Sequence, residues 1–231
     1  MERIGDIFQQ ATKYLSPVAG GKPPQQEKKG TIALPPVDWN IPAPLFNAVR
    51  RRRSIREYSE RPLSLKEFSL LCAAALGVTT RMDFGPLFAI PSAGAMNPLE
   101  LHVISHRVDG LPASVGRYRP GEHALEVVAR GDFRRAVVEA CLGQELAGSA
   151  GAVFAWTAVV ERSRRRYGQR CYRYIYLEAG HSAQNLLLAA TALNLGACAI
   201  GAFFDDQAAR LLGVDGVEET VLYLASVGTQ D

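Results

Sequence analysis

The sequence predicts an α+β domain in which long helices pack on a sheet of four or five strands. The first observation behind this prediction is Tyr172–Leu195, which has no proline and is apolar around almost every helical face. A helix of this kind belongs in the core of a soluble fold. The second is Gly151–Val159, a continuous apolar run that suits a central strand. The third is Leu99–His106, which alternates and is rich in residues that favour strands.

The first part of the chain is expected to be an extended arm, residues 1–43, ahead of a folded domain of residues 44–231. Ile7–Leu15 has the pattern of a short helix. Pro17–Gly30 is rich in Gly, Pro, Gln and Lys and should be loose, and Ile32–Pro42 is punctuated by proline and should be extended. The arm is either a disordered leader or a segment that wraps a partner subunit.

A capping box marks the next helix, Ser64–Leu76. Ser64 and Glu67 have the S-x-x-E spacing in which each side chain satisfies a backbone N–H of the other residue. Gly77 is expected to close this helix. The segment Thr79–Ile90 has no clear period and is predicted to be a loop.

The rest of the domain follows from shorter patterns. Gly196 stands where a glycine ends a helix, so it is expected to stop the long helix. Asp205 or Asp206 is expected to cap the helix that follows a short buried strand or turn at Ala197–Phe204. The other predicted elements are helices at Pro44–Arg52, Phe133–Leu142 and Asp205–Leu212, a basic helical turn at Glu161–Tyr167, and strands at Gly116–Tyr118, Ala124–Val128 and Glu219–Val227.

Composition narrows the class of protein. The chain has 231 residues, of which 48% are hydrophobic and 21% charged, and a formal net charge of +3, which gives no case for a nucleic-acid binder. The longest apolar run, Leu186–Leu193, is far short of the ~20 residues that a bilayer requires. Met1–Ser16 lacks the apolar core of a signal peptide, so we expect a cytoplasmic protein. The four cysteines form no CxxC pair, and we expect reduced, buried thiols and no metal site.

Polar residues mark two candidate sites. Glu178, His181 and Asn185 recur at helical spacing on the long apolar helix, and buried polar groups of this kind need partners. Five arginines fall within residues 50–56, and the alternation around Ser54 lets Arg52, Ser54 and Arg56 converge on one phosphate. The alternative is a solvated basic surface.

The third candidate site is the turn Pro91–Pro98, PSAGAMNP, whose small residues leave its backbone accessible. Its alternative is a simple loop before a strand. The sequence contains no GxGxxG after a strand and no GxxxxGK[ST], GxSxG or HExxH, so these dinucleotide, P-loop, hydrolase and zinc-protease signatures are absent.

Taken together, three segments resemble the FMN-dependent nitroreductase family. Arg52–Arg56 is similar to the N-terminal flavin-binding signature of that family, and Pro91–Pro98 is similar to its P-S-x-x-x-x-x-P turn. Tyr172–Asn185, followed by Gly196–Gly201, is the most specific likeness and singles out the SagB-type branch, which oxidises azolines. The resemblance runs from about Pro44 to Gly228.

The resemblance implies a mixed, mainly antiparallel sheet flanked by helices, an obligate homodimer, and FMN at the dimer interface. Arg52, Ser54 and Arg56 would hold the phosphate, ribityl chain and pyrimidine side of the flavin. The chain closes with Thr229–Asp231, without the basic residues that many relatives carry there. The residues that the resemblance assigns to the flavin are Arg52, Arg53, Ser54, Arg56, Ser92, Ala93, Gly94, Gln184, Asn185, Ile200, Gly201, Ala202 and Gly228.

The function implied by the resemblance is hydride transfer at flavin N5. In the SagB-type branch the substrate is a thiazoline or oxazoline ring in a modified peptide, which is oxidised to an azole. Tyr174 resembles a position where that branch has a catalytic tyrosine, and otherwise is an ordinary buried tyrosine. His181 is a candidate base, although a core histidine tied to Glu178 is the preferred reading. The alternatives are a stand-alone nitro or quinone reductase that uses NAD(P)H, and a flavin-binding protein without turnover.

Overall fold

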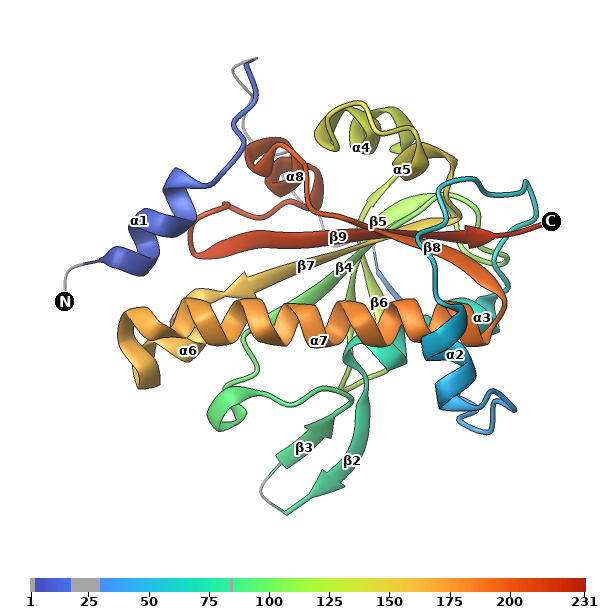
Figure 1. Ribbon diagram of the computed structural model, residues 1–231, viewed down its shortest axis with the longest axis horizontal. Helices are drawn as coiled ribbons and strands as arrows, with labels where there is room; N and C mark the ends of the chain where they lie inside the picture. The colour runs from blue at the N-terminus through green and yellow to red at the C-terminus, as the bar shows by residue number, and fades with distance from the viewer. Residues whose placement is uncertain (1–2, 18–29, 84) are drawn as a thin grey trace.

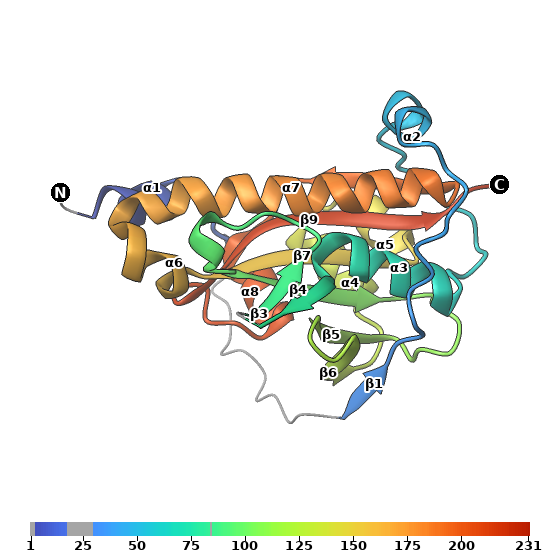
Figure 2. The same ribbon diagram turned by 90° about the horizontal axis from the view of Figure 1, so that it is seen from below.

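The computed structural model describes residues 3–17, 30–83 and 85–231 (Figure 1). The loose segment expected from Pro17 to Gly30 lies, apart from its two end residues, outside the described part of the chain. The remainder forms an α+β fold, as predicted, in which a long helix runs across one face of a sheet (Figures 1 and 2). No helix of the described ranges is both long and apolar enough to cross a membrane.

The sheet has seven strands in the order β1-β6-β5-β4-β7-β9-β8, more than the four or five expected. Every neighbouring pair is antiparallel, and parallel pairing among the described residues is limited to single bridges such as Ser54 with Ala197. The expected central strand is β7, between β4 and β9. The strands are β1 Thr31–Ala33, β4 Leu99–Ser105, β5 Ser114–Arg119, β6 Ala124–Arg130, β7 Ala152–Val159, β8 Leu195–Ile200 and β9 Glu219–Thr229.

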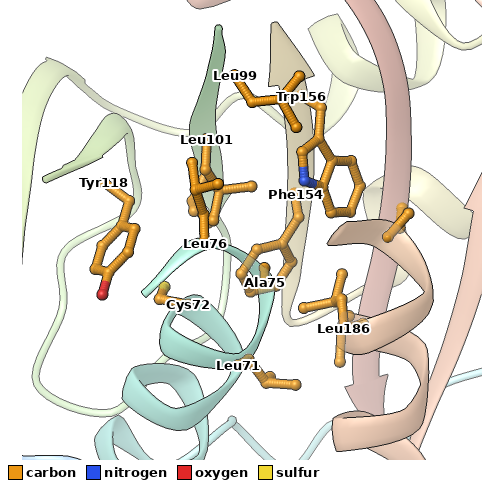
Figure 3. Packing of buried hydrophobic residues seen from close by; sticks show 14 of the residues in the cluster. Leu71, Cys72, Ala75, Leu76, Leu99, Leu101, Tyr118, Phe154, Trp156 and Leu186 are labelled. Atoms are coloured by element: carbon orange, nitrogen blue, oxygen red, sulfur yellow. The ribbon is translucent and has the colours of Figure 1, made fainter. Parts of the chain in front are cut away.

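Alternation along the strands directs side chains into two cores. Leu101, Phe154 and Trp156 point to the face covered by helices α3 and α7, where Figure 3 shows them in one cluster with Leu76 of α3 and Leu186 of α7. Ile104, Val153 and Ala155 occupy alternate positions on the same strands and point to the opposite face, which α4, α5 and α8 cover. The sheet is therefore buried on both faces, which explains why β7 reads as a continuous apolar run. The helices are α1 Ile4–Ala11, α2 Leu45–Arg51, α3 Leu65–Leu76, α4 Arg134–Ala140, α5 Leu146–Ser149, α6 Val160–Tyr167, α7 Cys171–Ala192 and α8 Asp205–Leu212.

The predicted capping box of α3 is confirmed. The Ser64 backbone N–H donates to Glu67 Oε2 at 2.7 Å, and the Glu67 N–H donates to Ser64 Oγ at 3.2 Å. The loop predicted for Thr79–Ile90 is wrong, because Val78–Met82 (β2) and Gly85–Phe88 (β3) form an antiparallel hairpin. Most side chains of this hairpin are exposed, so it lacks the half-buried alternation by which strands are recognised.

The end of α7 differs from its prediction. Asn194, with φ of 56°, takes the left-handed conformation that closes the helix, and Gly196 lies inside β8. Gly196 serves a packing purpose: a Cβ there would lie 2.7 Å from Ile55 Cγ2. Asp205 and Asp206 likewise do not cap α8. Their carboxylates accept the backbone N–H groups of Tyr14 and Ser16, at 3.0 and 3.1 Å, and tie the N-terminal segment to the domain.

The long helix α7 is apolar on most faces but not on all. One side is exposed and carries Leu177, whose exposed fraction is 55%. The other exposed residues of α7 are Arg173, Gly180, His181 and Gln184. In a single copy of the chain, this helix is therefore partly a surface helix.

Candidate functional site

The arginine segment lies on a floor made by two glycines. Gly196 of β8 and Gly228 of β9 are direct partners across the two strands. A Cβ on Gly228 would lie 2.7 Å from the ring of Tyr58, as one on Gly196 would from Ile55. The Ile55 N–H donates to Ala197 O at 3.0 Å, and the Tyr58 hydroxyl lies 2.9 Å from Ile55 O, to which it donates. The absence of two side chains thus lets the segment lie against the sheet.

This floor places basic side chains at the surface without acidic partners. Arg53 folds back and donates to the carbonyl oxygens of Arg50 and Arg52, at 3.0 and 2.8 Å. Among the described residues, the Arg56 guanidinium makes a single long hydrogen bond of 3.5 Å, to Ser54 O. Within the described part of the chain, no carboxylate pairs with Arg52, Arg53 or Arg56. The segment therefore suits a ligand that carries a phosphate, because guanidinium groups and a hydroxyl match its oxygens.

The turn predicted at Pro91–Pro98 lies at the other end of α7, where Glu178 holds it. The Ala93 N–H donates to Glu178 Oε1 at 2.9 Å, and the Asn97 N–H donates to Ser92 Oγ at 2.9 Å. Gly94 has φ of 58° and packs so closely on α6 that a Cβ would lie 2.5 Å from the Tyr167 hydroxyl. A side chain at Gly94 would displace the turn.

Glu178 is the least expected member of this site. It is 3% exposed, and within the described chain its second oxygen, Oε2, has no hydrogen-bond partner. Burial raises the pKa of this carboxyl, against the opposing effect of the bonds from the turn. The polar stripe on α7 signals the residue, but only the fold shows that its role is to hold the turn.

The two candidate catalytic residues lie in different surroundings. Tyr174 is half-buried beside the turn: its ring is 4.8 Å from that of Tyr167, edge to face, and its hydroxyl accepts from Arg170 Nε at 2.9 Å. His181 is exposed, and in the described structure it makes no hydrogen bond to Glu178. The reading of His181 as a core histidine is therefore wrong for the single chain, and its side chain is accessible.

The remaining candidates divide between surface and core. Gly201 and Ala202 are exposed just beyond the end of β8, and a Cβ on Gly201 would have only one atom within 4 Å, at 3.9 Å on Tyr223. Ile200 is buried at 2% exposure. Gln184 is exposed on α7, and Asn185 donates from Nδ2 to Ala89 O at 3.1 Å, which anchors the end of the hairpin.

In one chain the candidate residues do not form a single pocket. Glu178, at the turn, and Asn194, whose Oδ1 accepts from Arg51, are sixteen positions apart, which corresponds to roughly 24 Å along a helix. Figure 1 shows the same separation: the segment after α2 lies at the C-terminal end of α7, and the turn lies near α6. The two regions are therefore far apart within a single chain.

Comparison with known proteins gives one clear family. The profile of the nitroreductase family matches residues 49–229. A Methanocaldococcus jannaschii protein provisionally named as a nitroreductase, MJ1384, is 38% identical over 184 residues, which is 80% of this chain and 90% of that protein. The trifolitoxin operon protein TfxC of Rhizobium leguminosarum bv. trifolii is 24% identical over 88% of this chain and 61% of its own length.

Solved structures agree in fold. A provisionally named nitroreductase from Anabaena variabilis has a TM-score of 0.75 and 31% identity, and covers 97% of this chain, which in turn spans 47% of that longer chain. A Desulfovibrio desulfuricans structure solved in complex with FMN has a TM-score of 0.56 at 21% identity, over 80% of this chain and 85% of that one. The E. coli microcin synthetase complex McbBCD, with truncated pro-MccB17 bound, has a TM-score of 0.67 at 18% identity, over 99% of this chain and 82% of that one.

Proposed function

Because this chain belongs to the nitroreductase family, we propose that it is an FMN-dependent oxidoreductase that works as a homodimer. The observation that carries the proposal is the segment Arg52–Arg56, which lies on the Gly196–Gly228 floor with guanidinium groups that no carboxylate of the described residues neutralises. The D. desulfuricans structure, which was solved in complex with FMN, supports the choice of cofactor.

The residues present fit a flavin in three places. Arg52, Ser54 and Arg56 supply cationic and hydroxyl groups for its phosphate, ribityl chain and pyrimidine side. The turn at Ser92–Gly94 offers small residues that permit close approach of a ring, and Gly201 offers open backbone. When bound, FMN accepts or donates hydride at N5.

The same geometry supports the proposed dimer. The arginine segment and the turn are at opposite ends of α7, and the exposed face of this helix connects them. Two copies whose α7 helices cross antiparallel would bring the arginine segment of one chain toward the turn of the other. Tyr174 would then lie beside the flavin, since it packs next to the turn, where its hydroxyl can donate or accept a proton while Arg170 holds its position. His181, exposed on the shared face, is the second candidate base.

The substrate of the SagB-type branch, a thiazoline or oxazoline ring in a modified peptide, is the finer part of the proposal. Likeness to TfxC, a protein of the trifolitoxin operon, and to the microcin synthetase complex supports it. The alternative is a reductase of nitro compounds or quinones that takes hydride from NAD(P)H, which the likeness to MJ1384 favours. Anaerobic addition of NADPH distinguishes the two: rapid bleaching of the flavin supports the reductase, and bleaching by a thiazoline peptide but not by NADPH supports the dehydrogenase. No bleaching with either donor indicates a flavin-binding protein without turnover.

The arginine segment provides the direct test of the cofactor site. We expect the double variant Arg52→Ala, Arg56→Ala to purify without flavin and to bind added FMN at least tenfold more weakly, because two phosphate-pairing charges are lost. Arg135→Ala is the matched control, since Arg135 is exposed and pairs only with Glu139 on α4. FMN titration followed by flavin fluorescence measures both variants. Full retention of FMN by the double variant would refute the phosphate assignment.

A further inference from the structure

Two apolar surfaces are exposed in the described part of a single chain. The first is α2, which exposes Leu45, Phe46 and Val49 by 62%, 84% and 53% while it buries Ala48 against the body. The second is a groove of about 680 Å³ between α1 and the first half of α7. Isolated exposed apolar side chains are ordinary, but clusters of this kind mark interaction sites.

The groove exists because α1 is attached in an unusual way: its polar side chains face the body. Asp6 Oδ1 accepts from the Tyr172 hydroxyl at 2.6 Å and from Arg164 at 2.5 Å, and Gln9 Nε2 donates to Thr220 Oγ1 at 3.0 Å. The Gln169 side chain accepts the first free N–H groups of α1, those of Gly5 and Asp6, both at 3.0 Å.

The apolar side chains of α1 consequently face outward. Ile4 and Phe8 are 66% and 55% exposed, and together with Tyr176 and Leu177 of α7 they line the groove. An ordinary surface helix buries its apolar face instead. The polar attachment therefore holds α1 in place with a hydrophobic surface turned toward a partner.

We propose that the groove between α1 and α7 receives the α2 helix of a second copy of this chain, so that two reciprocal α2-in-groove contacts join the homodimer. This inference rests on the dimer of the proposed function and specifies which surfaces form it. Most of α2 and all of α1 precede residue 49, where the match to the family profile begins.

The positions of the two surfaces satisfy two-fold symmetry. The groove involves α7 around Tyr172–Leu177, and Arg51 of α2 is bonded to Asn194, just beyond the end of α7. The middle of this interval falls near Gln184, which is exposed. A two-fold axis there turns α7 end for end, and each α2 then lies over the groove of its partner, as an isologous interface requires. Figure 2 shows that α2 projects beyond the level of α7, toward the side from which a partner would approach.

The inferred contact gives α1 a role in the flavin site. Phe8 and Tyr176 line the groove and also border a smaller cavity of about 230 Å³ that reaches Gly201. An α2 helix seated in the groove would cover this side of Gly201 against solvent. The candidate cofactor site is thus completed by the partner at two places, the turn and α2.

Cysteine cross-linking tests the contact in the full-length chain. The four native cysteines are buried, so introduced ones dominate the chemistry. A chain with Phe46→Cys and Leu177→Cys should form a disulfide-linked dimer under mild oxidation. A bond within one chain is excluded because Leu177 lies roughly 26 Å along α7 from the end that holds α2. Phe46→Cys with Val217→Cys is the control, since Val217 is 67% exposed and lies in the segment between α8 and β9. Equal cross-linking of both pairs, or of neither, would overturn the proposal.

A second measurement does not depend on disulfide geometry. Phe46→Asp should weaken dimerisation at least tenfold in light-scattering dilution series, because a charge would enter an apolar groove, whereas Val217→Asp should leave it unchanged. A Phe46→Asp protein as dimeric as the wild type, or a monomeric wild type, would contradict the proposal. The alternative is that the groove binds an anionic ligand beside Arg170 and Arg173. In that case 8-anilinonaphthalene-1-sulfonate will bind the wild-type dimer, and Leu177→Asp will abolish that binding. This result would also contradict the proposal. FMN content, measured in parallel, separates this outcome from failure of the cofactor assignment.

Discussion

Glu178 shows how one buried carboxyl can hold a functional loop. Its Oε1 accepts the N–H of Ala93, and no described atom bonds its Oε2. Burial raises the pKa of its carboxyl, against the opposing effects of the bonds from the turn and of the nearby His181. The geometry of the turn at Ser92–Gly94 therefore depends on a group that is itself poorly solvated.

Glu178→Ala is expected to destabilise the protein by about 1–3 kcal/mol, since it leaves the half-buried Ala93 N–H without its acceptor. Glu178→Gln keeps an acceptor oxygen and should cost less. Urea denaturation of both variants measures the difference, and FMN titration reports whether the turn has moved. The role of Glu178 would be contradicted if Glu178→Ala were as stable as the wild type and bound FMN equally well.

A second carboxylate, that of Glu219, lies on the face of the sheet opposite to α7 and Glu178. Its carboxylate accepts from His102 Nε2 at 3.0 Å, Thr157 Oγ1 at 2.6 Å and Arg117 Nη2 at 2.6 Å. Burial lowers the pKa of His102, which fits a neutral ring that donates from Nε2 while its buried Nδ1 is left without a partner. Burial also opposes ionisation of Glu219, but the bonds from His102 and Thr157 and the charge of Arg117 outweigh it and bring its pKa to about 2.

This network predicts a loss of stability in acid. Because the pKa of Glu219 is depressed on folding, its contribution is fully present above the usual value near 4.5 and is lost as the pH falls toward about 2. The shift corresponds to up to about 3 kcal/mol. Unfolding free energies of the wild type and of Glu219→Gln, measured from pH 7 to pH 3, should converge as the pH falls. A constant difference across this range would show that Glu219 is not the titrating group.

At the scale of elements, the strands β8 and β9 support the arginine segment through two opposed glycines. Gly228→Ala should shift this segment, because the new Cβ would approach the Tyr58 ring to 2.7 Å. Overpacking of this kind costs about 1–3 kcal/mol, and we expect weaker FMN binding with it. Gly121→Ala is the control, since its nearest neighbour, the end of the Arg81 side chain, lies at 3.8 Å. Thermal unfolding and FMN titration measure both variants. A Gly228→Ala protein with unchanged stability and unchanged FMN affinity would contradict the role of these glycines in supporting the arginine segment.

The elements predicted correctly are those whose local pattern and burial agree. The capping box of α3 and the apolar run of β7 are examples, because each is decided within a few residues of sequence. The hairpin β2–β3 was missed because its strands are mostly exposed and carry no alternation. Gly196 was misread as a helix end because its purpose, contact with Ile55, depends on a residue far away in the sequence.

At the scale of the whole molecule, sequence likeness located the three candidate segments but not their relation. The arginine segment and the turn lie at opposite ends of α7, a separation that no local pattern contains. The inward-facing polar side chains of α1 could not be predicted from the sequence either, since Asp6 contacts Arg164 and Tyr172 only in the folded chain. The proposal that unites these observations is a flavin site that two copies of this chain complete together.

The visible absorption spectrum of the purified protein, with mass identification of the released chromophore, tests this claim most directly. We predict a yellow protein that absorbs near the flavin bands and releases FMN at close to one molecule per chain. A colourless protein that added FMN cannot reconstitute would contradict the cofactor, the site assignments and the proposed reaction together.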